Sequence, residues 1–373
     1  MEQHSEVFVG VDAAKLRHAV AVAEDGRQGE VRYLGEIGAD AESVRRLAAK
    51  LEKRHGGALH FCYEAGPTGY GLYRQLIGLG HRCTVVAPSL IPRRPGDHVK
   101  TNRRDAQQLA RLLRAGELTA VWVPDAEHEA MRDLVRSRDA AVGDLRRKRQ
   151  AISSMMLRQG RVFLGKKTWG ATHRHWLEKQ RFEHPAHGLV LQEMLLAVRH
   201  AEERLERIEA AIAEFLPTWS LAPVVEALQA LRGIGLVGAV TIMAEIGDLR
   251  RFDSPRRLMG YLGLVPGERS SGESVHRLGI TKAGNGRVRR ALVESAWSYR
   301  HLPRTGPAKQ YVHERVPPAV RDIAAKAQAR LCARYRALSG KGKRLTVTVT
   351  ARARELAGFV WAIAREVQTD PAT

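Results

Sequence analysis

The chain has 373 residues, and 61 Lys and Arg against 40 Asp and Glu give it a formal net charge of +21. A single hydrophobic core stops growing at roughly 250 to 300 residues, so this length predicts two or three domains. Hydrophobic residues make up 44% and charged residues 27%, a globular composition that excludes a disordered chain. The longest apolar runs are far shorter than the roughly 18 to 20 residues that span a bilayer, so we expect no membrane partner.

The N-terminal segment and the cysteines indicate a cellular compartment. Glu2 and Glu6 precede a strand-like segment, with no basic region followed by an apolar one, so no signal peptide is predicted. Cys62, Cys83 and Cys332 are too few and too scattered for a disulfide framework or a zinc site. We therefore expect a protein of the reducing cytoplasm.

The positive charge is concentrated in the C-terminal third. Residues 1–230 hold 35 basic and 29 acidic side chains, whereas residues 231–373 hold 26 and 11. Such a surplus is destabilising by self-repulsion unless a polyanion such as nucleic acid neutralises it. A solvated basic surface is the alternative, and nucleic-acid binding is the favoured interpretation.

Residues 1–125 are predicted to form an α/β domain. Apolar runs bounded by turn residues indicate strands, and apolar residues three or four apart indicate helices. The predicted elements are strands at 7–11, 19–23 and 32–37, a helix at 40–53, a strand at 59–63, a helix at 71–79 and a strand at 83–86. This is the element order of a ribonuclease H-like fold.

Residues 126–223 are predicted to form a helical spacer. Long helical patterns at 127–156 and 191–215 flank a stretch, 165–188, that breaks both. An antiparallel helical pair, interpreted as a coiled coil, joins domains or subunits in most proteins. Three tryptophans of the spacer either pack or stack on nucleotides, and packing is favoured: Trp169, Trp176 and Trp219.

Residues 224–373 are predicted to form a mainly helical domain that is rich in glycine. The Gly233-Ile234-Gly235 turn lies between two helical patterns and resembles a helix-hairpin-helix. In that motif, tight glycine turns expose backbone N–H groups to a phosphate. An ordinary glycine-packed helix turn is the alternative.

Acidic residues follow two predicted strands and begin a predicted helix. Asp12 directly follows the strand at 7–11, and Glu64 directly follows the strand at 59–63. Asn102 and Asp105 are three residues apart on a helix, so both lie on the same side of it. Carboxylates held together repel one another unless divalent cations lie among them, and Mg²⁺ prefers such oxygen ligands. Alternatively, these residues are turn or cap residues.

A polar segment at 266–277 is predicted to be a loop, and Arg287, Arg289 and Arg290 follow it closely. A serine beside a glycine in basic surroundings is where a phosphate is drawn in and where a hydroxyl can attack it. Serine-rich loops more often have no catalytic role, so the segment alone gives only a weak indication of a nucleophile.

The chain resembles the DEDD-type insertion-sequence transposases of the IS110 family, also called bridge-RNA-guided serine recombinases. Five ordered segments carry the resemblance: Val9 to Lys15, Tyr63 to Gly69, Lys100 to Ala106, the Gly233-Ile234-Gly235 turn, and Ser271 to Asn285. The resemblance implies an N-terminal RuvC-like domain, a coiled-coil spacer, and a C-terminal transposase domain with a serine nucleophile.

The family's catalytic residues fall on five positions of this sequence: Asp12, Glu64, Asn102, Asp105 and Ser271. Asn102 occupies the position of the third acid, where an amide oxygen can still bind a metal or a water molecule but brings no charge. The resemblance therefore implies a metal site on the remaining three carboxylates, with Mg²⁺ or alternatively Mn²⁺ bound. Asp97 is a nearby acid that could replace the missing one, and Ser270 and Ser274 are alternative nucleophiles.

The resemblance also implies a mechanism and partners. A bridge RNA encoded by the element pairs with donor and target DNA, so that base pairing selects the sequence. Serine attacks a DNA phosphodiester and gives a phosphoserine linkage, in a site built across the protomers of a homotetramer, a dimer of dimers. We expect eight basic residues to bind nucleic acid: Arg103, Arg104, Arg269, Arg277, Lys282, Arg287, Arg289 and Arg290. The implied location is the prokaryotic cytoplasm, at the nucleoid.

Two other functions fit the same residues. The first is a metal-dependent, structure-specific DNA nuclease of RuvC type, in which the carboxylates support hydrolysis and Ser271 is only a loop residue. The second is a catalytically silent nucleic-acid-binding protein, with Asn102 as the sign of lost activity.

Overall fold

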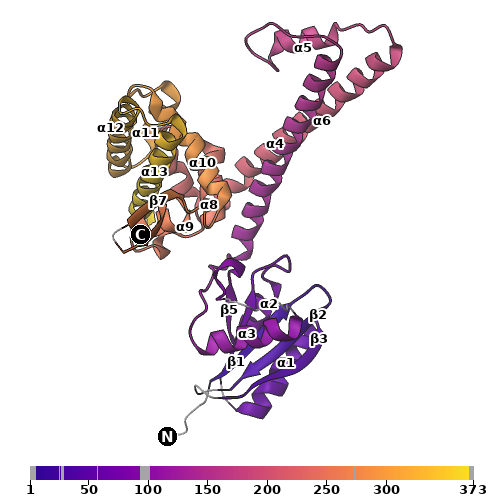
Figure 1. The fold of residues 1–373 in the computed structure, drawn as a ribbon, viewed down its shortest axis with the longest axis vertical. Coiled ribbons are helices and arrows are strands. Elements are labelled where there is room, and N and C mark those ends of the chain that lie inside the picture. Colours follow the sequence, from indigo (N-terminus) through magenta and orange to yellow (C-terminus); the bar gives the residue numbers. More distant parts are fainter. Residues whose placement is uncertain are drawn as a thin grey trace. The chain divides into compact units, whose positions relative to one another are not determined.

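A computed structural model describes residues 6–24, 26, 29–56, 58–92, 101–272 and 274–368. By contacts, the chain divides into two compact units, Met1–Val123 and Pro124–Thr373, drawn in Figure 1. The first is a mixed α/β unit, and the second contains two long helices and a mainly helical domain.

The first unit is built on one five-stranded mixed sheet. Its strands are β1 Val7–Ala13, β2 Arg17–Ala23, β3 Val31–Gly38, β4 Leu59–Glu64 and β5 Arg82–Val86. They lie in the order β3-β2-β1-β4-β5, in which β4 is parallel to β1 and β5, and β2 is antiparallel to β1 and β3. The element order predicted from the sequence is confirmed.

Helices cover both faces of this sheet. They are α1 Ala41–His55, α2 Gly71–Gly78 and α3 Asn102–Arg114, with a short 3-10 turn η1 at Pro88–Leu90. Val9 and Phe61 pack with residues of α1 and α2 on one face, whereas Cys62 packs with Leu109 of α3 on the other. Since side chains alternate along a strand, residues of even number in β1 and β4 lie on the α3 face.

The second unit begins with two long helices that pack antiparallel (Figure 1). They are α4 Ala126–Arg158 and α6 Pro185–Phe215, and the short helix α5 Ala171–Glu178 lies between them in the chain. Arg138 of α4 pairs with Glu209 of α6 at 2.7 Å, and Arg149 pairs with Glu202 at 2.5 Å, so the helices run in opposite directions. The predicted helical pair is confirmed, and α6 begins earlier than predicted because Pro185 suits the first turn of a helix.

The remainder of the second unit is a helical domain around one large core. Its helices are α7 Ala222–Leu228, α8 Leu236–Ile246, α9 Pro255–Tyr261, α10 Gly286–Ala296, α11 Pro307–Arg315, α12 Pro318–Gly340 and α13 Leu345–Gln368. Short 3-10 turns occur at η2 Leu216–Thr218, η3 Leu249–Arg251 and η4 Trp297–Arg300. Helix α13 packs against α7, α9, α10 and α12, and its buried residues include Leu356 and Val360.

Within the described residues, no single helix is long and apolar enough to cross a membrane. One pair of helical segments, Pro185–Thr218 with Ala222–Leu228, passes the same test of length and composition only when the two are taken together, and the chain bends by 117° between them.

Candidate nucleic-acid-processing site

Asp12 and Glu64 lie at the same end of the sheet. Val11 of β1 is the register partner of Tyr63 of β4 in a parallel pair, and the next residue of each strand is the acid. Both acids have even numbers, so both lie on the face that α3 covers. Neighbouring strands are about 4.8 Å apart, so Asp12 and Glu64 directly follow neighbouring positions of the strand pair.

A glycine in β1 brings α3 close to this face. A Cβ atom at Gly10 would lie 2.2 Å from the carbonyl oxygen of Ala106 and 2.4 Å from the backbone nitrogen of Ala110. Only a residue without a side chain allows this approach. Asp105 precedes Ala106 directly, so the close contact holds the first turn of α3 against the strand that carries Asp12.

Helix α3 begins with the cap that the sequence provides. The Thr101 hydroxyl accepts a hydrogen bond from the backbone N–H of Arg104 at 3.3 Å, as an N-cap residue does. Asn102 is the first helical residue and is exposed, whereas Asp105 is half-buried. The position of the missing acid is therefore the more solvent-accessible of the two.

These residues suit a hard divalent cation by their oxygen atoms and by their placement at one end of the sheet. Nevertheless, the described part of the chain contains no group of three His, Cys, Asp or Glu side chains that could hold a metal ion as it stands. A shared ion among Asp12, Glu64 and Asp105 therefore requires these side chains to rearrange. Asp97, the predicted substitute, lies outside the described residues.

The predicted serine loop is instead a β-hairpin, so the loop assignment is wrong. Strands β6 Pro266–Ser271 and β7 Ser274–Ile280 are antiparallel, and Ser271 is the register partner of Ser274 at the tip. Nearly every residue of the hairpin is exposed.

The three candidate serines differ in their surroundings. The Ser270 hydroxyl donates a hydrogen bond to Oε1 of Glu268 at 2.8 Å. Ser271 precedes Gly272 at the exposed tip, and no group among the described residues hydrogen-bonds its hydroxyl. The hairpin therefore presents the hydroxyls of Ser271 and of its register partner Ser274 to solvent, whereas the Ser270 hydroxyl is bound to Glu268.

The base of the hairpin is fixed to the turn after α9. The N–H of Thr281 donates to the carbonyl of Val265 at 3.0 Å, and the N–H of Lys282 donates to that of Gly263 at 3.1 Å. A Cβ atom at Gly284 would lie 1.9 Å from the carbonyl oxygen of Tyr261. The exposed tip consequently projects from an anchored base.

A buried carboxylate links the start of α10 to the long helix α4. Asn285 caps α10, and its side-chain amide donates a hydrogen bond to Glu245 of α8 at 2.7 Å. Arg136 of α4 donates to both oxygens of Glu245, at 2.9 and 3.0 Å. Burial raises the pKa of Glu245, but the hydrogen bonds from Arg136 and Asn285 and the nearby charges outweigh it, and the pKa is lowered overall.

Sequence reasoning missed Glu245. The only available signal was one carboxylate inside the apolar helix 236–246. Its side chain is completely buried, and such a charge requires partners. The junction of Arg136, Glu245 and Asn285, called the Glu245 junction below, therefore joins α4, α8 and the start of α10.

The eight predicted nucleic-acid-binding residues separate into two groups. Three of them stabilise the protein itself: Arg287 and Arg290 pair with Asp139, and Arg289 donates to the carbonyls of Leu262 and Ala283. The other five have exposed side chains: Arg103, Arg104, Arg269, Arg277 and Lys282. The guanidinium of Arg103 lies 5.4 Å from the centre of the Tyr33 ring.

The glycine turn before α8 borders a cavity of about 500 Å³. Gly235 is the N-cap of α8 and provides no side-chain cap, so the first N–H groups of the helix lack that partner. Arg138, Arg287 and Arg290 line the same cavity. This arrangement is compatible with the predicted phosphate contact.

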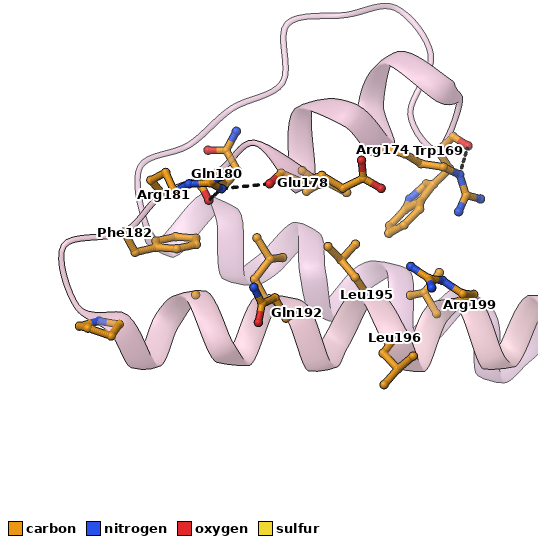
Figure 2. Close-up of a pocket in the computed structure, with 15 residues that line it drawn as sticks. Trp169, Arg174, Glu178, Gln180, Arg181, Phe182, Gln192, Leu195, Leu196 and Arg199 are labelled. Atoms are coloured by element: carbon orange, nitrogen blue, oxygen red, sulfur yellow. Dashed lines mark hydrogen bonds between the residues drawn. The ribbon is translucent and has the colours of Figure 1, made fainter.

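The tip of the long helices forms a cavity of about 660 Å³ between α5 and α6 (Figure 2). Trp169 lines it, and the guanidinium groups of Arg149 and Arg174 lie 5.1 and 5.9 Å from its ring centre. Trp176 packs in the core of this tip, and Trp219 is buried in the main helical core. Trp176 and Trp219 pack as predicted, whereas Trp169 packs against the core of the tip and also lines the cavity.

Comparisons with known proteins agree with these observations. Residues 9–159 match the model of the DEDD transposase domain of IS110 elements, and residues 225–312 match the transposase IS116/IS110/IS902 family. The transposase for insertion sequence element IS1533 of Leptospira borgpetersenii is 30% identical over 91% of this chain and 99% of its own length. A Sinorhizobium fredii protein named as a transposase, y4qE, is 60% identical over 98% of this chain and 90% of its own length.

The protein is therefore a DNA transposase of the DEDD type. It belongs to the IS110/IS116 family of insertion-sequence transposases. Transposase domains of the DEDD type are typically metal-dependent, which agrees with the oxygen ligands at the end of the sheet.

Proposed function

We propose that this transposase cuts and rejoins DNA through a covalent bond to Ser271. The Ser271 oxygen attacks a backbone phosphorus, a new O–P bond forms, and the P–O bond to the leaving strand breaks. The serine proton is lost to solvent, and the leaving oxygen takes up a proton. Attack by a hydroxyl of another strand reverses these steps and rejoins the DNA.

The exposure of Ser271 supports this function above the others. Among the three candidate serines, Ser270 is hydrogen-bonded to Glu268, whereas Ser271 and its register partner Ser274 are exposed at the tip, and the family resemblance assigns the nucleophile to Ser271. A nucleophile must reach a phosphorus inside a DNA backbone, and a projecting hairpin with an anchored base gives that reach.

The carboxylates have a supporting role in the proposal. Asp12, Glu64 and Asp105 would hold Mg²⁺, or Mn²⁺ in its place, and Asn102 would contribute a neutral oxygen. Bound there, the ion stabilises negative charge on the transferring phosphoryl group. The three side chains would hold the ion at the end of the sheet where β1 and β4 stop.

The remaining features of the proposal concern organisation and partners. We assign a RuvC-like domain to residues 1–125, a coiled-coil spacer to 126–223 and a C-terminal domain with a helix-hairpin-helix-like turn to 224–373. A bridge RNA guides the protein to donor and target DNA at the nucleoid, and a homotetramer brings serine and carboxylates of different protomers together.

Trapping tests the serine step. DNA incubated with the protein, Mg²⁺ and guide RNA is expected to yield a protein–DNA adduct that survives denaturation. The adduct is expected to vanish in Ser271→Ala and to persist in the matched variants Ser270→Ala and Ser274→Ala. A persistent adduct in Ser271→Ala would refute the assignment.

The same experiment separates the other functions. Free DNA ends without an adduct would identify a metal-dependent nuclease. Binding without cleavage at any Mg²⁺ or Mn²⁺ concentration would identify a silent binding protein.

A further inference from the structure

A second basic cavity, of about 350 Å³, lies in the helical domain. Its walls come from the turn after α7, the segment before α11, α11 itself and the first turns of α12. The charged and titratable side chains that line it are Arg232, Arg304, Lys309, His313, Arg321 and Asp322. None of these residues belongs to the hairpin, to the candidate metal site or to the predicted nucleic-acid-binding set.

The charge of this cavity is not balanced. Four cationic side chains face one carboxylate, that of Asp322. Within the described ranges, the guanidinium groups of Arg304 and Arg321 form no ion pair or hydrogen bond with another group, and both residues are exposed. Arg287 and Arg290 differ, because both pair with Asp139. The side chains that line the cavity therefore carry an excess of positive charge.

Lys309 supplies a cation that water does not fully solvate. Its ammonium donates hydrogen bonds to the carbonyl of Gln229 and, at 2.5 Å, to that of Ile234. Burial lowers the pKa of Lys309 to about 8. An ammonium group has three donors, so one remains after these two bonds. A bound anion would restore the solvation that burial removed.

Lys309 also connects the cavity to the glycine turn. Gln229 is the C-cap of α7, and Ile234 lies between the two glycines that precede α8. His313, one turn further along α11, lies with its Nε2 atom 3.0 Å from the carbonyl oxygen of Ala230. Lys309 and His313 thus connect the cavity to the segment between α7 and α8.

We propose that this cavity binds a phosphodiester group of a nucleic-acid backbone, in addition to the reacting phosphate. The inference rests on the proposed function, because it requires that the protein binds nucleic acid. Guanidinium groups donate paired hydrogen bonds to phosphate oxygens. Because Arg304 and Arg321 are exposed, their guanidinium groups can donate such bonds to a phosphate that enters the cavity. DNA and guide RNA share this backbone chemistry.

The test measures the salt dependence of binding by the full-length protein. The double variant Arg304→Gln/Arg321→Gln removes two exposed charges, so it leaves the buried core intact. The matched control Arg204→Gln/Arg207→Gln removes the same charge from exposed positions of α6. Fluorescence anisotropy with duplex DNA, and separately with RNA of equal length, gives the binding constant at each salt concentration.

Each phosphate contact contributes about 0.9 to the slope of log K against log salt for duplex DNA. The cavity variant is expected to lose about one unit of slope with at least one of the two nucleic acids, and the control to lose none. Loss with DNA alone assigns the cavity to DNA, and loss with RNA alone assigns it to the guide.

Equal slopes for the cavity variant, the control and the unaltered protein would overturn the proposal. If the unaltered protein then still forms the Ser271 adduct, only the cavity assignment fails. If the unaltered protein binds neither nucleic acid at low salt, the proposed function fails with it.

Discussion

At the scale of single residues, Glu245 is a charge whose protonation affects folding. Its carboxylate is buried and receives hydrogen bonds from Arg136 and Asn285. The folded state therefore favours the ionised form, and the pKa lies below its ordinary value. A lowered carboxyl pKa stabilises the fold above the unfolded-state pKa of about 4.3, and this contribution is lost as pH falls through the folded-state pKa.

Replacing Glu245 by Gln is expected to lower the unfolding free energy at neutral pH by about 2 kcal/mol. The value is below that of a fully buried pair because the Arg136 side chain is partly exposed. Glutamine does not titrate, so the unfolding free energy of the variant is also expected to fall less than that of the unaltered protein as the pH drops below about 4.3. Urea unfolding at several pH values measures both effects.

The matched control is Glu226→Gln, which removes an exposed pair with Arg315. Exposed pairs contribute about 0 to 1 kcal/mol, so this change is expected to have little effect. Equal effects of the two substitutions would show that the Glu245 junction does not stabilise the fold.

The same residue marks a limit of sequence reasoning. Arg136 is 109 positions before Glu245, and Asn285 is 40 positions after it. No local pattern joins residues so far apart, since the contact exists only after α4, α8 and α10 have packed. In contrast, Asp12 and Glu64 could be placed at strand ends because each directly follows its own apolar run.

At the scale of elements, the seating of α3 on β1 depends on Gly10. Gly10→Ala places a Cβ atom against the backbone of Ala106 and Ala110, which cannot rotate away. Overpacking of this kind destabilises by about 1 to 3 kcal/mol. The first turn of α3 is expected to move away from Asp12, so adduct formation is expected to fall more than DNA binding does.

The control for this substitution is Gly78→Ala, in α2, where an added Cβ atom meets nothing within 4 Å. Alanine favours a helix over glycine by about 1 kcal/mol, so this variant is expected to be unchanged or more stable. Urea unfolding and adduct yield are measured on both. Gly10→Ala with the stability and yield of the control would contradict the role of this contact.

The sequence predicted the elements of the first unit well and the serine hairpin poorly. The strands at 7–11 and 59–63 are apolar because both of their faces are covered by helices. Apart from Ile280, which packs against the helical core, the hairpin strands 266–271 and 274–280 are largely exposed. They therefore show no alternation of apolar and polar residues. Their structure comes from backbone pairing and from the anchored base.

At the scale of the whole molecule, the net charge of +21 predicts strong dependence of DNA binding on salt. A protein that makes about 6 to 10 phosphate contacts loses about 10³ to 10⁵ in affinity between 50 and 200 mM salt. We expect a loss of this order in an anisotropy titration with duplex DNA. An uncharged solute at equal osmolality is the control, and a flat salt response would contradict the electrostatic basis of binding.

The base and the outer strands of the hairpin differ in how well they tolerate amino-acid substitutions. The base permits almost no change at Gly284, because any side chain there overlaps the carbonyl of Tyr261. The outer residues of the hairpin are exposed, so replacing them is expected to change the stability of the fold little. In copies of the insertion sequence, amino-acid substitutions should therefore accumulate along the outer part of the hairpin. Ser271 is expected to be retained because the proposed reaction needs its hydroxyl, and Gly284 because no side chain fits beside the carbonyl of Tyr261.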